Sequence, residues 1–183
     1  MKKKSPLKPI VVVALAVILV VFLVRHFHIN NFHTVVPGVL YTSGQPEGMD
    51  YTRLLYKYHL ATVVNVRASS EHREQNWYNE EVTWIRENGV SYKELPLLRN
   101  SRNNEHFPDQ KTQKAFLKIM ADKTNLPVLV HGSSGEERVA MLVAVYLIKG
   151  ADESVDSAAK IARKIKGSPL SKAEEQFIKS LAR

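Results

Sequence analysis

Apolar and polar positions recur along the chain with two periods, which predict strands separated by helices. Short apolar or alternating runs predict four strands, the first as a single strand or a hairpin: residues 35–41, 62–67, 92–97 and 128–131. Apolar residues at helical spacing predict amphipathic or buried helices near residues 51–58, 71–88, 109–120, 139–148, 155–165 and 172–181. Because strands alternate with helices, we expect an α/β fold with a central, mostly parallel sheet flanked by helices.

The longest apolar run lies near the N-terminus, where fifteen residues from Ile10 to Val24 carry no polar side chain. Lysines precede this run, which favours a cytoplasmic N-terminus and a single-pass membrane protein with its domain outside, in the periplasm of a bacterium. The expected organisation is a basic tail (1–9), a transmembrane signal anchor (10–24), a juxtamembrane linker (25–34) and one folded domain (35–183). The run spans only about 22 Å as a helix, against about 30 Å of hydrocarbon. Secretion after signal cleavage is the alternative.

The composition limits the chemistry that this domain can perform. Four N-terminal lysines account for half of the formal net charge of +8, so the domain is only mildly basic. This balance suits an anionic ligand, and we expect no nucleic-acid partner. Cysteine is absent, which excludes disulfides, thiol chemistry and thiolate metal sites.

Three histidines near the predicted linker, His26, His28 and His33, are the first candidates for a metal site. No carboxylate or fourth ligand stands at a suitable spacing, so a solvated linker is the simpler interpretation. We therefore expect no metal and no cofactor.

Residues 128–139 carry the most distinctive pattern. An apolar strand ending at His131 leads into Gly-Ser-Ser-Gly-Glu-Glu-Arg and then into a long apolar helix. A loop before a helix N-terminus directs backbone N–H groups into one space, and Arg138 adds a forked cation suited to phosphate oxygens. Residues 132–138 are therefore predicted to bind phosphate or another anion.

The segment from His131 to Arg138 resembles the signature loop of the cysteine-dependent protein phosphatases, in its small dual-specificity-like form. That loop is His-Cys, five residues and Arg, and here five residues separate Gly132 from Arg138. Gly132 stands where the family has its nucleophilic cysteine, and Val139 where it usually has Ser or Thr. A Ser-Gly-Gln-Pro turn at 43–46, the strand at Val63 and the polar loop 98–108 also fall where that family has them. The resemblance covers about residues 35–150 and implies a dual-specificity phosphatase-like fold.

The resemblance also implies a role for each matching residue. Arg138 would bind the phosphoryl oxygens together with the loop residues, His131 would precede the nucleophile position, and Gly135 would be the loop glycine. The loop residues implied in phosphate binding are Ser133, Ser134, Gly135, Glu136 and Glu137. Gly132 cannot attack phosphorus and Val139 cannot supply a hydroxyl group, so the ordinary catalysis is expected to be lost.

The sequence offers weak candidates for a replacement nucleophile and for the general acid. Ser133 or Ser134 could replace the nucleophile, but an alcohol needs a positioned base and none is visible. Asp109 is a candidate general acid, although an Asp after Pro at a helix start is more simply a helix cap. Glu105 and His106 are weaker candidates for the same role.

These observations predict a membrane-anchored pseudophosphatase whose loop binds a phosphorylated protein, lipid or inositol. The carboxylates of Glu136 and Glu137 should weaken its affinity for a dianion. Two alternatives stay open. One is a scaffold for a protein partner with a vestigial pocket. The other is a dual-specificity or tyrosine phosphatase, a phosphoric monoester hydrolase, whose active parent has cysteine in place of Gly132.

Overall fold

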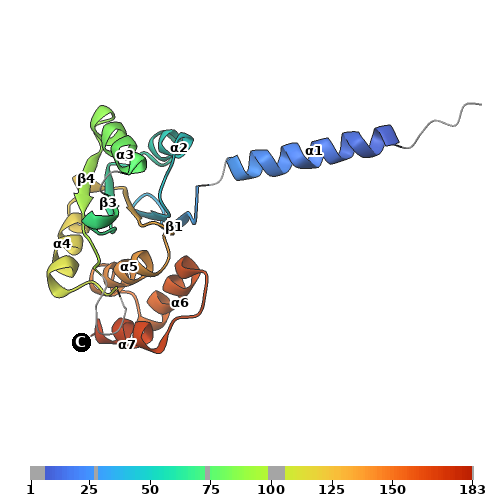
Figure 1. The fold of residues 1–183 in the computed structure, drawn as a ribbon. Helices are drawn as coiled ribbons and strands as arrows, with labels where there is room; N and C mark the ends of the chain where they lie inside the picture. Colours follow the sequence, from blue (N-terminus) through green and yellow to red (C-terminus); the bar gives the residue numbers. More distant parts are fainter. Residues whose placement is uncertain (1–6, 27–28, 73–74, 99–105, 183) are drawn as a thin grey trace, which may run out of the picture.

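Five strands form one sheet in the order β1-β2-β5-β3-β4. The computed structural model describes residues 7–26, 29–72, 75–98 and 106–182 (Figure 1). The strands are β1 (His33–Val36), β2 (Leu40–Ser43), β3 (Thr62–Asn65), β4 (Ser91–Glu94) and β5 (Val128–His131). β1 pairs antiparallel with β2, and the other three neighbouring pairs are parallel, so the sheet is mixed.

The helices follow the predicted spacing closely. They are α1 (Leu7–His26), α2 (Met49–Tyr58), α3 (Asn76–Glu87), α4 (Gln110–Ala121), α5 (Glu137–Lys149), α6 (Val155–Lys166) and α7 (Lys172–Ser180), with short 3-10 helices η1 (Ser69–Glu71) and η2 (Lys123–Asn125). The predicted helix 71–88 begins too early, because η1 precedes α3. The hairpin is confirmed as β1 and β2, and the strand 128–131 as β5.

The strand side chains alternate between two layers of helices. Val128 and Val130 face the main core, which α4, α5, α6 and α7 cover. Leu129, between them, points to the other face and packs with Leu54 of α2. Val63 lies on that second face and packs against Ile85 of α3. This alternation, with one helical layer on each side, gives the layered α/β arrangement in Figure 1.

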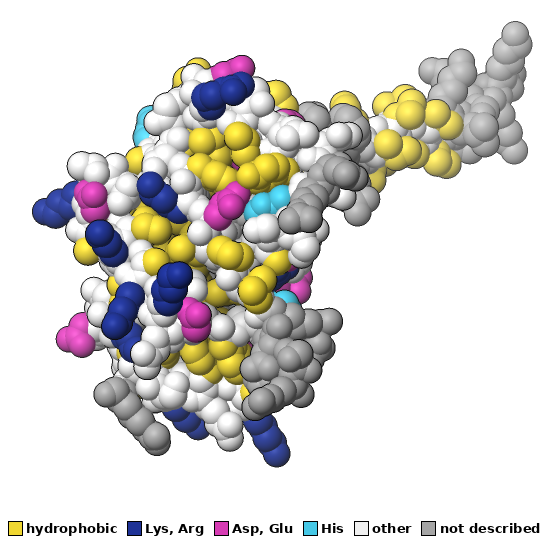
Figure 2. Space-filling model, turned by 60° about the vertical axis from the view of Figure 1, so that its left-hand side comes forward, with side chains coloured by type: hydrophobic (Ala, Val, Ile, Leu, Met, Phe, Trp, Pro, Cys, Tyr) yellow, Lys and Arg dark blue, Asp and Glu magenta, His cyan; other side chains and the backbone are white. Residues whose placement is uncertain are grey.

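The prediction of a transmembrane helix, and with it of a single-pass membrane protein, was wrong. Within the part of the chain that the structure describes, no helix is both long enough and apolar enough to cross a membrane. The physical reason is length, because the uninterrupted apolar run covers only about 22 Å of the roughly 30 Å required. In Figures 1 and 2, α1 extends away from the sheet. Its apolar side chains, such as Ile10 and Ile18, are exposed.

Candidate anion-binding site

The carboxyl ends of three neighbouring parallel strands meet at one edge of the sheet. In the register of β2, β5 and β3, His131 lies between Ser43 and Asn65. All three residues are buried. Ligands of open α/β sheets bind outside the carboxyl ends of the strands. The loop that joins β5 to α5 leaves the sheet at this edge.

The turn after β2 fixes this loop from behind. The backbone N–H of Gln45 donates to the carbonyl oxygen of Ser133 (3.0 Å). The side-chain amide of Asn31 donates to the carbonyl oxygen of Gly135 (2.9 Å). Gly135 has a φ of +75°, and a Cβ there would collide with the backbone of Ser43. The close approach of turn and loop therefore requires a glycine at this position.

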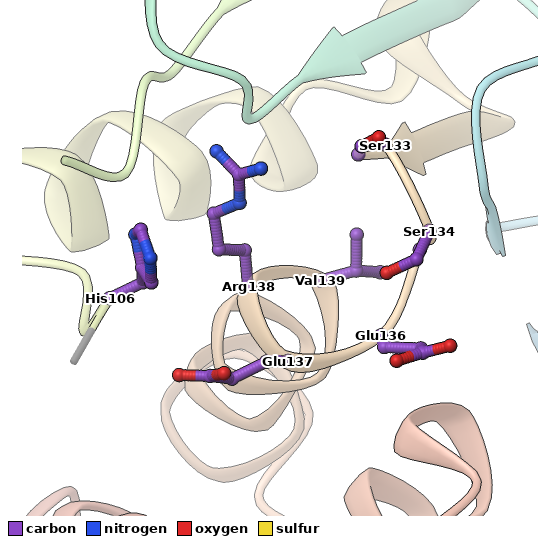
Figure 3. A pocket seen from close by; sticks show the side chains of 9 residues that line it. His106, Ser133, Ser134, Glu136, Glu137, Arg138 and Val139 are labelled. Atoms are coloured by element: carbon purple, nitrogen blue, oxygen red, sulfur yellow. The ribbon is translucent and has the colours of Figure 1, made fainter. Parts of the chain in front are cut away.

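A cavity of about 190 Å³ opens in front of the loop, lined by His106 and residues 132–139 (Figure 3). The backbone N–H groups of residues 133–139 donate to no acceptor among the described residues. The first of them belong to the loop and the last to the first turn of α5, whose N–H groups have no intrahelical acceptor. Such a run of N–H groups attracts an anion. The structure thus gathers the sequence-predicted residues 132–138 around one cavity.

Arg138 is held in place by Glu71 of η1. Its Nη1 donates to Oε1 of Glu71 (2.6 Å) and its Nη2 to Oε2 (3.0 Å). This fork uses one N–H of each terminal nitrogen, so Nε–H and two further N–H groups lie outside the pairing. The hydrogen bond from Arg138 lowers the pKa of Glu71 from 4.5 to about 2. Glu71 therefore orients Arg138 and offsets its positive charge.

Arg67 extends this arrangement away from the cavity. Its Nε lies 3.5 Å from Oε2 of Glu71, and its guanidinium lies over the ring of Trp77, 3.9 Å from the centroid. Burial lowers the pKa of Arg67 from its ordinary value. Sequence reasoning missed Glu71, although the spacing of four residues from Arg67 is a weak signal for a pair. Nothing in the sequence indicates its partner Arg138, 67 positions away.

A buried contact between a histidine and a carboxylate lies directly behind the loop. Nε2 of His131 is 3.1 Å from Oε1 of Glu81 on α3, and neither side chain is exposed. Tyr92 donates to the same carboxylate (3.0 Å), as does Gln45 (3.2 Å). Burial raises the pKa of Glu81, but the positive charge of His131 and these donors outweigh it, so the pKa lies below its ordinary value. Glu81 thus connects α3 to β4, β5 and the turn after β2.

The sequence contains a signal for a buried partner of Glu81. It falls three residues after Tyr78 and four before Ile85, on the apolar stripe of α3. A carboxylate on a buried helix face requires a partner, because an unpaired buried charge is costly. The sequence therefore indicates a buried pair, whereas only the fold identifies His131 as the partner.

Gly132 has room for a side chain. A Cβ at this position would lie 3.4 Å from Cγ2 of Val66, 3.5 Å from Cγ2 of Val139 and 3.8 Å from the nitrogen of Gly135. These are ordinary van der Waals contacts. Val139 is completely buried and belongs to the main core. Glycine is thus not required sterically at position 132, in contrast to position 135.

Of the remaining predicted site residues, the loop residues line the cavity and Asp109 does not. Ser133, Ser134 and Glu136 are exposed at the cavity, and Glu137 is half-buried. Asp109 lies at the N-cap of α4, where it accepts from the backbone N–H of Thr112 (2.7 Å), and it does not line the cavity. This hydrogen bond lowers its pKa.

Of the two weaker candidates, His106 lines the cavity, and its Nδ1 lies 3.1 Å from the carbonyl oxygen of Leu97. Glu105 lies outside the described residues. Among the residues that the structure describes, no cluster of three or more His, Cys, Asp or Glu could hold a metal ion. His28 of the predicted linker lies outside that set.

Comparison with known proteins shows which family the chain matches. A family model described as "Tyrosine phosphatase family" matches residues 27–150, more than half of the chain. The tyrosine-protein phosphatase-like protein OCA2 of Saccharomyces cerevisiae is 26% identical over 117 residues, which are 63% of this chain and 55% of that protein. The chain therefore spans about half the length of this curated relative.

Solved structures share the fold. The core catalytic domain of the PP-IP phosphatase SIW14 from S. cerevisiae, in complex with citrate, is similar with a TM-score of 0.65 and 19% identity, over 81% of this chain and 83% of that chain. PTPMT1 in complex with PI(5)P is similar with a TM-score of 0.63 and 18% identity, over 82% of this chain and 94% of that chain. At these identities the likeness concerns the fold alone.

Proposed function

Because the chain belongs to the tyrosine phosphatase family, we propose that it is a phosphatase-like protein that binds a phosphorylated ligand at residues 132–138 without hydrolysing it. The observation that carries this proposal is the run of backbone N–H groups from 133 to 139, which have no described acceptor and belong to residues that line a cavity. Binding by these groups and by Arg138 does not depend on a thiol. The site retains the means to hold a phosphoryl group.

The absence of hydrolysis follows from two positions. In our proposal, Gly132 occupies the place of the family's nucleophile and Val139 the place of the hydroxyl that assists the leaving thiolate. The chain contains no cysteine that could take over. Ser133 and Ser134 are exposed alcohols, and no described side chain forms a hydrogen bond with either hydroxyl to activate it.

The similar structures support a phosphorylated ligand. SIW14 is a PP-IP phosphatase, and the structure of PTPMT1 is a complex with PI(5)P; both involve phosphorylated inositols. We extend to this chain only the shared element, a phosphate group bound at the loop.

Calorimetric titration of the full chain with phosphate, phosphotyrosine and a phosphorylated inositol tests the binding. We expect at least one of these anions to bind, and Arg138→Ala to weaken that binding about tenfold or more, because a charge-assisted hydrogen bond is lost. Arg163→Ala is the matched control, since Arg163 is exposed and pairs with Glu175 on α7. No heat with millimolar anion would refute the proposal, as would binding that Arg138→Ala leaves unchanged.

Restoring the thiol tests the proposed loss of catalysis. The space at Gly132 accepts a Cβ, and a cysteine there would lie among N–H groups that lower the pKa of its thiol. We expect no hydrolysis of an aryl phosphate by the wild-type chain or by Gly132→Ala. Gly132→Cys should release about one equivalent of phenol in a burst, as the S–P bond forms and the ester O–P bond breaks. Adding Val139→Thr should speed the subsequent steady state.

Two results of this experiment would contradict the proposed loss of catalysis or its proposed cause. Hydrolysis by the wild-type chain at the rate of Gly132→Cys would show that the unaltered site is catalytic. A Gly132→Cys chain that is folded, binds phosphate and yet releases no phenol would show that more than the nucleophile is missing.

A scaffold with a vestigial pocket is the second candidate, and the pairing of Arg138 with Glu71 favours it. That pairing already satisfies two guanidinium N–H groups without a ligand. A protein partner captured equally well by the wild-type chain and by Arg138→Ala would support the scaffold.

A further inference from the structure

The charges around the cavity are unusual for a site that binds an anion. Arg138 is the only Lys or Arg among the described residues that line it, and Glu136 and Glu137 line it as well. Arg138 is also already paired with Glu71. The described side chains of the lining therefore supply more negative than positive charge, and within this part of the chain the attraction for an anion comes mainly from backbone N–H groups.

The two carboxylates at the mouth differ from those behind the loop. Glu71 and Glu81 each have an ion-pair partner. The carboxylates of Glu136 and Glu137 have neither a hydrogen bond nor an ion pair among the described residues. Acidic residues at a helix N-terminus stabilise the helix, which explains their tolerance in α5. The same charges repel any further phosphate group that approaches the mouth.

The three charged side chains at the start of α5 point in different directions. In Figure 3 the guanidinium of Arg138 lies above the first turn of α5, and the carboxylates of Glu137 and Glu136 lie below it, one to the left and one to the right of the helix. A ligand whose phosphate occupies the loop can therefore present a second group to these carboxylates. A carboxylate binds such a group most strongly when the group is positively charged, and it repels a second phosphate.

We infer that the ligand of this site is a phosphomonoester that carries an ammonium or guanidinium group beside its phosphate, rather than a polyphosphate. The inference rests on the proposed function, since it requires phosphate binding at residues 132–138. The phosphate accepts from the loop N–H groups and from Arg138, and the cation pairs with Glu136 or Glu137. A small phosphorylated amine and a phosphorylated peptide with Lys or Arg next to the phosphorylated residue both provide this chemistry.

Competition among matched ligands tests the inference. The small-molecule arm compares O-phosphoethanolamine with ethyl phosphate, which lacks the ammonium group. The peptide arm compares phosphotyrosine peptides flanked by Lys with the same peptides flanked by Glu. The polyanion arm uses inositol hexakisphosphate. We expect each cationic ligand of the first two arms to bind about five- to tenfold more tightly than its partner, and the hexakisphosphate to bind more weakly than phosphoethanolamine.

The double variant Glu136→Gln/Glu137→Gln should remove this preference and strengthen binding of the hexakisphosphate. Glu87→Gln/Glu153→Gln is the matched control, because it removes the same charge from exposed positions that do not line the cavity. A preference in only one of the first two arms identifies the source of the cation and supports the inference. Tightest binding of the hexakisphosphate, or a preference unchanged in the double variant, overturns it. If no phosphate compound binds, the proposed function itself fails.

Discussion

The two sides of the loop after β5 are built under different constraints. On its closed side, Gly135 touches the backbone of Ser43, and the buried pair of His131 and Glu81 lies behind the strand end. On its open side, Ser133, Ser134 and Glu136 are exposed, and the buried Gly132 has space for a Cβ. The closed side allows almost no change of volume or charge, whereas the open side allows both.

This difference explains how the site can keep its shape while its chemistry changes. Packing and buried charge fix the course of the backbone, and the loop residues that line the cavity keep backbone N–H groups without a described acceptor. The side chains that would take part in catalysis contribute little to the course of this backbone. Three predictions test the comparison, beginning with the largest effect.

Gly135→Ala should destabilise the fold by about 3 kcal/mol, because it combines a strained positive φ with overpacking against backbone atoms. Gly132→Ala should change stability by less than about 1 kcal/mol, since its Cβ meets only ordinary contacts. Urea unfolding followed by circular dichroism measures both free energies of unfolding.

Gly38→Ala separates the cost of a positive φ from the cost of overpacking at Gly135. Gly38 also has a positive φ, +73°, but a Cβ there would meet no atom within 4 Å. Its cost should be that of backbone strain alone. Equal costs at positions 132 and 135 would remove the distinction between the closed and open sides.

Glu81→Gln should destabilise the fold by about 2 kcal/mol, because His131 loses its charged partner in a buried site. Glu87→Gln on the same helix is the control, since Glu87 is exposed, and it should have almost no effect. Thermal and urea unfolding provide the measurement.

The double variant Glu81→Gln/His131→Gln extends this test. If the two residues act as a pair, its cost is smaller than the sum of the single costs. Additive costs would show that the contact of 3.1 Å contributes no coupling.

Acidification should weaken the pair between Glu71 and Arg138. The pKa of Glu71 is lowered from 4.5 to about 2, so its ionised form stabilises the fold fully above pH 4.5 and this contribution is lost as the pH falls towards 2. The side chain is 30% exposed, and solvent screening limits the contribution to about 1 kcal/mol or less.

The difference in unfolding free energy between the wild-type chain and Glu71→Gln should therefore shrink between pH 5 and about pH 2. Glu175→Gln, which breaks an exposed pair with Arg163, controls for general effects of charge. A difference that stays constant over this range would contradict the assigned pKa.

The sequence predicted local features of the fold because they depend on near neighbours. The helix cap at Ser171 is one example, since its hydroxyl accepts from the N–H of Glu174 as the Ser-x-x-Glu pattern indicates. The end of α6 at Gly167, with a φ of +71°, is another. The strand 128–131 and the loop that follows were predicted at the correct positions for the same reason.

Long-range partners could not be predicted from one sequence. Glu71 and Arg138 are 67 positions apart, and only the order of the strands brings them together. The extent of the N-terminal apolar run was visible, but its interpretation as a membrane anchor was wrong. At Gly132 the residue type was evident, whereas the space around it required the fold.

That space also bears on how the site could change over evolutionary time. Glycine codons that end in a pyrimidine differ from cysteine codons only at the first base. A Cβ at position 132 meets only ordinary contacts, so the first atom of the new side chain fits in this fold. The genetic distance between a glycine and a cysteine at this loop is then a single point mutation, and selection on chemistry alone can retain either state.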